Sequence, residues 1–406
     1  MRVRVLLLVA AMLLVPPAAR ADDAFQSFIQ SLWPQARDLG VSRATFDAAT
    51  RNLEPDLSLP DLTLPGRDRP PPLQAEFVQT PADYVRETTI ARLAAQGKKL
   101  LDQHRATLAT IEQRTGVPPS VILAIWGRET VYGSHRLPHH AMRVLATQAY
   151  AGRRKDMFRQ EFLLAMKIVQ DGNIPLADMK SSWAGAMGHT QFLPSEFYKY
   201  AVDFDGDGRR DIWNSVPDAL ASAAAQLVGK GWQRGKRWAY EVKTPGNVDC
   251  TVAQPSHVLP IGEWLKRGYV PAYRRKLSAA ETQQPASLLL PEGTYGPAFL
   301  TPKNYYVIKD YNFSDLYALF VGHLSDRIID GRPFETPWSK TAQLKTEAVE
   351  AMQQRLTELA LYQDKIDGKA GMLTRAALGA YQKANGLKLD CWPTAAVLAH
   401  MRSARN

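Results

Sequence analysis

Cysteine is nearly absent from this chain. Only Cys250 and Cys391 occur among 406 residues, which excludes a fold held together by several disulfides. Stability must therefore come from ordinary hydrophobic cores, and the length allows two or three of them. The two cysteines could pair in an oxidising compartment, but they lie far apart in the sequence and in different predicted domains. We therefore expect no disulfide between them.

Long apolar runs are also missing, except at the N-terminus. The run Val5–Val15 is shorter than the roughly 20 residues that span a bilayer, which excludes a transmembrane anchor there. Arg2 and Arg4 precede the run, and Ala19-Arg20-Ala21 follows it as a small-x-small cleavage site. This order predicts a cleavable export signal over residues 1–21. No cysteine follows the run, so a lipid anchor is not expected, and we predict a periplasmic protein.

The chain is basic but has no basic run interleaved with aromatic residues, which argues against nucleic-acid binding. Its formal net charge is +10. Three of those charges, on Arg2, Arg4 and Arg20, belong to the export signal, so the mature chain stays basic. A basic exported protein suits an anionic polymer such as cell-wall glycan, or an anionic membrane surface.

Helical periodicity dominates the chain and predicts a mainly α fold. Residues 22–331 are predicted to form one catalytic domain with a small β insertion over Tyr240–Val258, and residues 332–345, rich in Gly and Pro, a linker. Residues 346–406 are predicted to form a C-terminal three-helix domain. The predicted helices are Tyr84–Gln103, Lys155–Asp171, Val216–Lys230, Ser314–Ile329, Thr346–Leu361, Leu373–Asn385 and Pro393–Arg402.

Glu129 occupies a position that helical spacing assigns to an apolar face. Ile122, Ile125 and Trp126 recur with it at helical spacing within Pro119–Glu129. A carboxyl group in apolar surroundings tends to keep its proton, because desolvation penalises the charged form. Such a group can act as a general acid. The alternative is a structural ion pair with a buried arginine, which also perturbs carboxyl groups.

The segment Asp203–Asp211 resembles the start of an EF-hand calcium loop. Aspartates stand at positions 1, 3, 5 and 9, with Gly208 at position 6. The twelfth position is Asn214 rather than Glu, so the closing carboxylate is expected from Asp218. The predicted Ca²⁺ ligands are Asp203, Asp205, Asp207, the Arg209 carbonyl and Asp218. The alternative is a solvated acidic turn.

Two further segments carry groups that could bind sugars. Ser182–Pro194 combines small residues with Ser182 and Gln191, and could equally be a tight turn between helices. Asn304–Asn312, followed by Tyr317, is rich in tyrosine, and could equally supply core aromatics. His135, His139 and His140 lack the spacing of a zinc protease, so no zinc site is expected there.

Taken together and in this order, these segments resemble the membrane-bound lytic transglycosylase B family of peptidoglycan-cleaving enzymes. The resemblance covers residues 23–331 and rests on Trp126–Gly133, Ala184–Ser195, the aspartate loop and Tyr311-Asn312. It implies a lysozyme-like helical fold with Glu129 as the single catalytic acid. It assigns glycan contacts to Ser182, Gln191, Tyr311, Asn312 and Tyr317, and calcium to the aspartate loop.

Two departures from the family pattern matter. Some relatives carry a tyrosine where this chain has Gln226, so that role is not transferred. The lipid-anchoring cysteine of the membrane-bound relatives is absent, so the chain resembles their soluble branch.

The C-terminal residues resemble a three-helix peptidoglycan-binding domain. The resemblance rests on Ile366–Gly371, Tyr381-Gln382 and Asn385–Leu387, while the usual Asp-Gly near the end reads Asp390-Cys391. The sequence therefore predicts a peptidoglycan lytic transglycosylase that cleaves the bond between N-acetylmuramic acid and N-acetylglucosamine and leaves 1,6-anhydro ends. A hydrolytic muramidase and a non-catalytic wall-binding scaffold are the alternatives. No organic cofactor is expected, and the expected partner is the peptidoglycan glycan strand.

Overall fold

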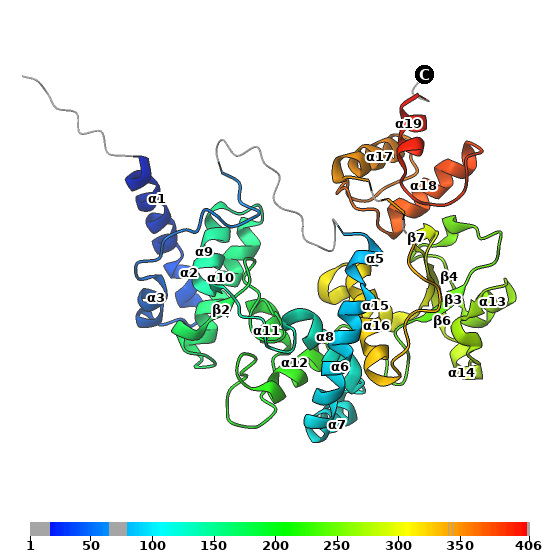
Figure 1. Cartoon of the computed structure of the whole chain (residues 1–406). Coiled ribbons are helices and arrows are strands. Elements are labelled where there is room, and N and C mark those ends of the chain that lie inside the picture. The colour runs from blue at the N-terminus through cyan, green and yellow to red at the C-terminus, as the bar shows by residue number, and fades with distance from the viewer. Residues whose placement is uncertain (1–16, 65–78, 340, 343, 404–406) are drawn as a thin grey trace, which may run out of the picture. The chain divides into compact units, whose positions relative to one another are not determined.

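The computed structural model describes residues 17–64, 79–339, 341–342 and 344–403, and the chain divides into two units (Figure 1). Unit 1 comprises residues 1–72 and 137–198, and unit 2 comprises residues 73–136 and 199–406. Of the predicted export signal, only residues 17–21 are described, within the first helix. Within the described ranges, no helix has both the length and the apolar composition needed to cross a bilayer.

Unit 1 is a helical unit with one short strand pair. Helices α9 and α10 pack against each other, and Phe25, Phe46, Phe158 and Phe162 are fully buried. Strands β1 and β2 are antiparallel and pair His139 with Ser181. The elements of unit 1 are α1 (Pro17–Ser31), α2 (Trp33–Asp38), α3 (Arg43–Thr50), β1 (His139–His140), α9 (Ala141–Ala151), α10 (Lys155–Gln170), β2 (Lys180–Ser181) and α11 (Pro194–Tyr200), which reaches the boundary.

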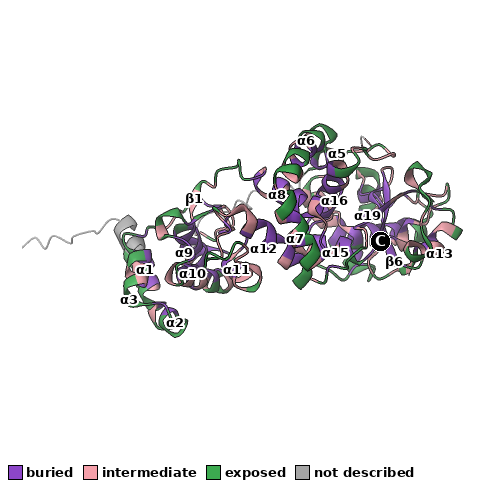
Figure 2. Cartoon of the chain, turned by 90° about the horizontal axis from the view of Figure 1, so that it is seen from below, coloured by how far each residue is buried: buried purple, intermediate pink, exposed green. Residues whose placement is uncertain are grey.

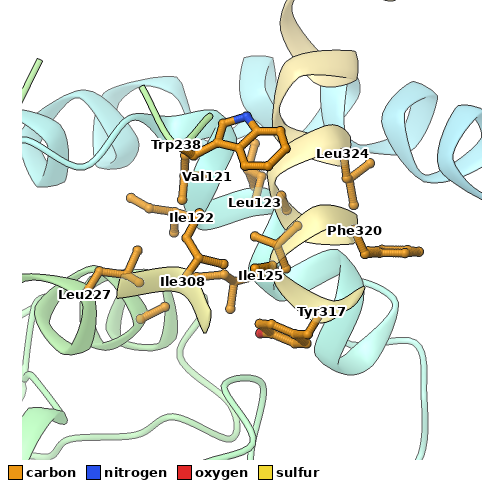
Figure 3. Close-up of a cluster of buried hydrophobic side chains, with 14 of the residues drawn as sticks. Val121, Ile122, Leu123, Ile125, Leu227, Trp238, Ile308, Tyr317, Phe320 and Leu324 are labelled. Carbon is orange, nitrogen blue, oxygen red and sulfur yellow. The ribbon is translucent and has the colours of Figure 1, made fainter. Parts of the chain in front are cut away.

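The helices of unit 2 surround α8, whose residues from Ser120 to Gly127 are all buried. Helices α6 and α16 pack on α8. Figure 3 shows Ile122 and Ile125 of α8 among side chains from α12, α15 and α16, and in Figure 2 the buried colour marks the inner helix α12. The helices are α5 (Pro81–Tyr84), α6 (Glu87–Gln103), α7 (Arg105–Thr115), α8 (Pro119–Thr130), α12 (Val216–Gly229), α15 (Lys303–Asn312) and α16 (Asp315–Ile329).

A five-stranded antiparallel sheet is inserted between α12 and α15, in the order β4-β6-β8-β3-β5. It begins inside the predicted β insertion but continues to Thr301, well beyond the predicted end at Val258. Helices α13 (Ile261–Lys266) and α14 (Ala279–Thr282) and the strand β7 (Pro291–Thr294) lie within the same insertion. The strands of the sheet are β3 (Tyr240–Lys243), β4 (Val258–Pro260), β5 (Val270–Pro271), β6 (Pro285–Leu289) and β8 (Ala298–Thr301).

The C-terminal module, residues 344–403, contains α17 (Thr346–Glu358), α18 (Met372–Ala384) and α19 (Ala395–Ser403). Its own apolar core includes Leu356 and Tyr381. The buried Gln353 amide organises the loop before α18, since its Oε1 accepts from the Gly368 backbone N–H at 2.8 Å and its Nε2 donates to Thr374 Oγ1 at 3.1 Å. This mainly helical architecture, with a small sheet and a C-terminal helical module, confirms the predicted fold class.

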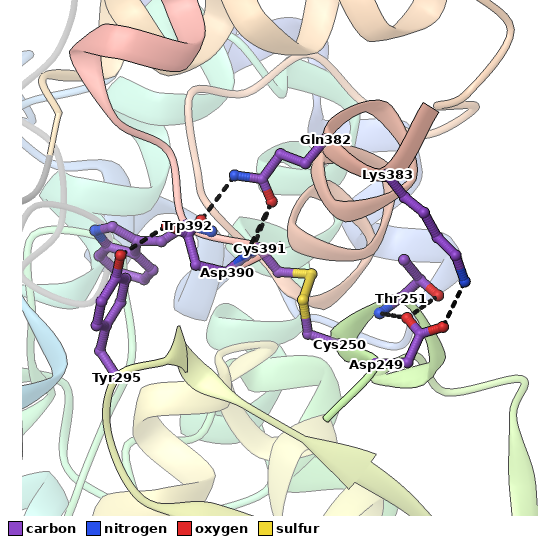
Figure 4. Close-up of a disulfide and its surroundings, with 9 residues drawn as sticks. All are labelled: Asp249, Cys250, Thr251, Tyr295, Gln382, Lys383, Asp390, Cys391 and Trp392. Carbon is purple, nitrogen blue, oxygen red and sulfur yellow. Dashed lines mark hydrogen bonds and ion pairs between the residues drawn. A yellow bond between two sulfur atoms is a disulfide. The ribbon is translucent and has the colours of Figure 1, made fainter. Parts of the chain in front are cut away.

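The expectation of no disulfide is wrong. Cys250 and Cys391 are bonded, with their Cα atoms 6.1 Å apart (Figure 4). Around the bond, Lys383 Nζ lies 2.7 Å from Asp249 Oδ2, and Tyr295 donates to Asp390 Oδ2 at 2.7 Å. The expectation failed because it treated separation in sequence, and assignment to different domains, as separation in space. The C-terminal module instead packs on the sheet-bearing insertion of unit 2.

The segment predicted as a linker is held in place where it is described. The Phe334 ring stacks on His323 with the centroids 3.8 Å apart. The backbone N–H groups of Glu335 and Thr336 both donate to the Glu241 carboxylate. The chain therefore runs from α16 into the C-terminal module along a packed path.

Candidate active site

Helix α8 ends at Thr130, one residue after the candidate acid Glu129. The next two residues after Thr130, Val131 and Tyr132, have left-handed backbone angles, with φ of 51° and 57°. This conformation is uncommon for any residue with a side chain and is unfavourable for a β-branched one. Gly127, one turn before the end, lies against the Tyr132 ring so closely that a Cβ would come within 2.7 Å of it. Glu129 therefore lies on a helix end whose geometry is fixed by its neighbours.

Glu129 is partly buried, and its carboxylate contacts α16. Tyr317 donates a hydrogen bond from its hydroxyl to Glu129 Oε1 at 2.5 Å. The Tyr317 side chain is itself buried. Burial, together with the nearby Glu129 carboxylate, raises the pKa of Tyr317 well above its usual value. Tyr317 therefore keeps its proton, so that it remains a hydrogen-bond donor to Glu129.

The tyrosine pair Tyr311 and Tyr317 extends the site to the end of α15. Their rings stack at 5.9 Å between centroids with an interplanar angle of 15°. Asn312 is the last residue of α15, and Ser314 caps α16 by accepting from the Tyr317 backbone N–H. Unit 2 thus brings together Glu129, Tyr311 and Tyr317, with Asn312 adjacent in the chain.

Arg128 is a neighbour of Glu129 that sequence reasoning did not single out. Its guanidinium lies over the Tyr84 ring at 4.6 Å and the Phe320 ring at 5.0 Å, and its Nε donates to the Tyr84 hydroxyl at 3.0 Å. These contacts fix the cation against aromatic faces of α5 and α16. In the sequence, the position of Arg128 next to Glu129 could have marked it as a possible site residue. Only the fold shows that its guanidinium packs on the rings of Tyr84 and Phe320.

Ser182 and Gln191 belong to unit 1, in a tight loop after β2. Ser182 Oγ accepts from the Ala186 backbone N–H at 3.2 Å, and Gln191 donates from Nε2 to the Gly188 carbonyl at 3.0 Å. Gln191 has a left-handed φ of 54°. Gly185 approaches Leu145 so closely that a Cβ would meet its side chain at 2.2 Å. The small residues of this segment therefore serve a close-packed turn, in which both polar side chains bond to the backbone and stay partly exposed.

Three of the predicted calcium ligands gather in unit 2. Carboxylate oxygens of Asp203, Asp205 and Asp218 all lie within 4.8 Å of one another. Asp218 is fully buried, and burial raises its pKa. Asp207 is exposed and forms an ion pair with Arg209 at 3.0 Å, outside this group. The acidic group is the chemistry that a hard cation requires.

The aspartate loop is also held by its own backbone. Asp218 Oδ1 accepts from the Phe204 N–H and its Oδ2 accepts from the Asp211 N–H, both at 2.8 Å. Asp203 accepts from the N–H groups of Gly206 and Gly208. The gathered carboxylate oxygens fit a calcium ion. Several of the same oxygens also accept hydrogen bonds from backbone N–H groups of the loop.

The histidines considered for zinc, His135, His139 and His140, do not belong to any cluster of metal-ligating side chains among the described residues. His140 forms a hydrogen bond between its Nε2 and the Leu176 carbonyl at 2.8 Å. Burial lowers the pKa of His140. Among the described residues, the aspartate set is the one cluster of three or more metal-ligating side chains.

Comparisons with known proteins bear on both parts of the chain. The family model described as transglycosylase SLT domain matches residues 24–326, and that of a peptidoglycan binding domain matches residues 345–401. Membrane-bound lytic murein transglycosylase B of Escherichia coli (strain K12) is 31% identical over 230 residues, which make up 56% of this chain and 61% of that protein. The chain thus spans less than two thirds of that relative's length.

Solved structures are similar over more of the chain. SltB3 from Pseudomonas aeruginosa, in complex with NAG-anhNAM-pentapeptide, is 36% identical and covers 93% of this chain and 99% of its own, with a TM-score of 0.81. The lytic transglycosylase Slt35 of Escherichia coli, in complex with calcium, is 29% identical and covers 61% of this chain and 76% of its own, with a TM-score of 0.51.

Proposed function

Because the chain belongs to the family of transglycosylase SLT domain proteins, we propose that it is a peptidoglycan lytic transglycosylase with Glu129 as its single catalytic acid. The observation that carries the assignment of the acid is the contact between Glu129 Oε1 and the Tyr317 hydroxyl. A fixed donor on one carboxyl oxygen orients the group. The substrate is the bond between N-acetylmuramic acid and N-acetylglucosamine.

The proposed mechanism needs one acid used twice. Glu129 protonates the glycosidic oxygen, and the bond between that oxygen and the anomeric carbon breaks. The acetamido group of the muramyl sugar stabilises the oxocarbenium-like centre. Glu129, now a carboxylate, removes the proton of the muramyl 6-hydroxyl, and that oxygen bonds to the anomeric carbon. The product is a 1,6-anhydro sugar, and no water is consumed.

The other predicted site residues would bind the glycan. In this proposal, Tyr311 and Asn312 contact the sugars beside Glu129, and Tyr317 orients the acid. Ser182 and Gln191 are proposed as glycan contacts within unit 1. Their presentation on a close-packed turn supports that role, since fixed polar groups bind sugars with little loss of entropy.

We propose a structural calcium ion at the aspartate group. Asp203, Asp205 and Asp218 would hold it, and the gathered carboxylates support this assignment. An ion there would neutralise their charge and brace the segment between α11 and α12. The predicted ligand Asp207 would have to leave its ion pair with Arg209 in order to join.

The wider assignments follow from the sequence. We propose export to the periplasm by cleavage near residue 21, a catalytic domain over residues 22–331, and a peptidoglycan-binding domain over residues 346–406. The ranges of the two family matches, 24–326 and 345–401, support this division. The basic charge supports an anionic wall polymer as the partner.

The deciding experiment digests purified sacculi and weighs the soluble fragments by mass spectrometry. The wild-type protein is expected to release fragments with anhydro ends, which are lighter by one water than reducing ends. Glu129→Gln should abolish their release while leaving the melting temperature close to that of the wild type. Reducing ends would identify a hydrolytic muramidase, and binding without release would identify a scaffold. Turnover by the purified Glu129→Gln variant would refute the role of this residue.

A further inference from the structure

A cavity of about 260 Å³ lies in unit 2 where the turn between α15 and α16 faces the C-terminal module. Phe313 and Leu316 line it from the catalytic part, and Met372, Leu373 and Arg375 line it from α18. Its volume is near the lower end of small-molecule sites, about 300 Å³, and suits one small ring rather than a whole chain. Neither the single-acid mechanism nor the fold accounts for it.

Phe313 has two features that folding alone does not favour. Its side chain is 78% exposed, more than any other large apolar residue among those described. Its backbone is left-handed, with φ of 58° and ψ of 20°, at the C-cap of α15. That position normally selects Gly or Asn, and a bulky residue there is strained. A strained and exposed aromatic residue beside a cavity indicates a binding surface.

Arg375 supplies a buried cation that borders the same cavity. The residue is 7% exposed, and its Nη2 has no hydrogen-bond partner. The nearest carboxylate oxygen, Asp315 Oδ2, is 3.7 Å away, while Asp315 Oδ1 is already paired with Lys309 at 2.7 Å. The Nη2 atom thus has a long ion pair and no hydrogen bond, and an oxygen of a bound molecule would supply the hydrogen bond.

The position of Phe313 in the chain indicates which molecule this is. It follows Tyr311 by two residues, so the two Cα atoms are at most about 7 Å apart. A polymer that contacts Tyr311 can therefore reach Phe313 within one or two sugar units. The other wall of the cavity belongs to the module that matches a peptidoglycan binding domain. A flat apolar ring beside polar donors is the arrangement that binds a sugar face and its hydroxyls.

We propose that Phe313 and Arg375 form an additional saccharide subsite, shared by the catalytic part and the C-terminal module, that holds the glycan strand beyond the bond that is cut. The proposal rests on the proposed function, because it takes the glycan strand as the ligand. The sugar ring stacks on Phe313, and Arg375 Nη2 donates to one of its oxygens.

The test measures binding in the inactive Glu129→Gln background, with peptide-free glycan strands of defined length as the probe. Phe313→Ala should raise the Kd for long strands about 3- to 10-fold and leave the Kd for a tetrasaccharide unchanged. Phe313→Tyr should bind like its parent. The matched control is Ile329→Ala, which removes another exposed apolar side chain (65% exposed) at the end of α16, and should change neither Kd.

A second variant separates binding from folding. Phe313→Asn suits the left-handed backbone, so it should melt at or above the parent temperature while binding long strands as weakly as Phe313→Ala. Equal Kd values for the parent and both Phe313 variants would refute the subsite, and so would a loss that is the same for tetrasaccharide and long strands. Phe313-dependent binding by a protein that releases no anhydro fragments would refute only the proposed function.

Discussion

At the scale of single residues, the candidate site depends on one hydrogen bond between two helices. Tyr317 lies in the first turn of α16 and Glu129 in the last turn of α8, and their side-chain oxygens are 2.5 Å apart. Helix packing sets this distance, because Ser120 of α8 and Ser325 of α16 also form a hydrogen bond, at 2.9 Å. The acid is thus oriented by the same contact surface that stabilises unit 2.

Tyr317→Phe should lower kcat about 10- to 100-fold, because it removes a hydrogen bond to an ionisable group worth about 1.5–3 kcal/mol. The ring remains in the core, so the circular dichroism spectrum should not change. The control is Tyr306→Phe, which removes another hydroxyl hydrogen bond, to Ser287, and should leave kcat unchanged. A wild-type kcat for Tyr317→Phe would show that this contact does not orient the acid. Release of anhydro fragments under saturating substrate measures both variants.

A second residue gives a prediction about pH. Burial lowers the pKa of His323 to about 4, from an ordinary value near 6.5. Between these values the unfolded chain binds a proton that the folded chain does not, so stability falls as the pH falls through this window. The full shift corresponds to about 3 kcal/mol. Urea unfolding at pH 7 and pH 4 should therefore show a loss that is smaller in His323→Gln. Equal losses in the two proteins would assign the pH dependence to other groups.

At the scale of elements, the sequence predicted the helices with strong periodicity. The range Lys155–Asp171 became α10, which ends at Gln170, and Val216–Lys230 became α12, which ends at Gly229. Both carry an apolar stripe that a helix must bury, and such a stripe can be recognised from neighbouring residues alone. Tyr84–Gln103 failed at one end, where the structure has α5, a break at Val85, and then α6 from Glu87.

The sheet and α8 show why the rest could not be predicted. Strands β6 and β8 are short and almost entirely buried, so they lack the alternation that marks a strand with one exposed face. Every α8 residue from Ser120 to Gly127 is buried, so the apolar face assigned to Glu129 was not distinct from the rest of the helix. Glu129 was singled out by its helical spacing among apolar residues and by its family motif, whereas its contact with Tyr317, 188 residues away, depends on tertiary packing.

The aspartate loop yields a prediction about metal. Calcium at about 100 times its Kd should stabilise the protein by about 2.7 kcal/mol, and a chelator should lower the melting temperature accordingly. Asp205→Asn should remove this calcium dependence, because its oxygen belongs to the gathered group. Asp207→Asn is the matched control, since its carboxylate pairs with Arg209, and it should keep most of the dependence. Differential scanning calorimetry with and without calcium decides, and identical curves would exclude the ion.

At the scale of the whole molecule, the C-terminal module is fixed to the catalytic part by a covalent bond and by ion pairs. The disulfide joins residues separated by 141 positions, and Arg375 faces Asp315 across the same junction. The cavity proposed as a saccharide subsite lies along this junction. The two parts of unit 2 would therefore bind one strand together.

Reducing the disulfide should destabilise the protein by about 2–5 kcal/mol, because the bond closes a long loop of the unfolded chain. The melting temperature should fall on addition of dithiothreitol. The double variant Cys250→Ser, Cys391→Ser should melt at the temperature of the reduced wild type and should not respond to the reductant. A reductant effect of the same size in the double variant would show that the bond is not responsible.

The bond between Cys250 and Cys391 also sets an order of assembly. The second sulfur is synthesised 141 residues after the first, and a reducing cytoplasm keeps both as thiols. Newly made chains in a reducing cytoplasm therefore lack the disulfide, which forms once the chain reaches an oxidising environment. For a protein that is exported, as proposed above, the disulfide would therefore form only after export, and a recombinant preparation would contain it only if the compartment of production is oxidising.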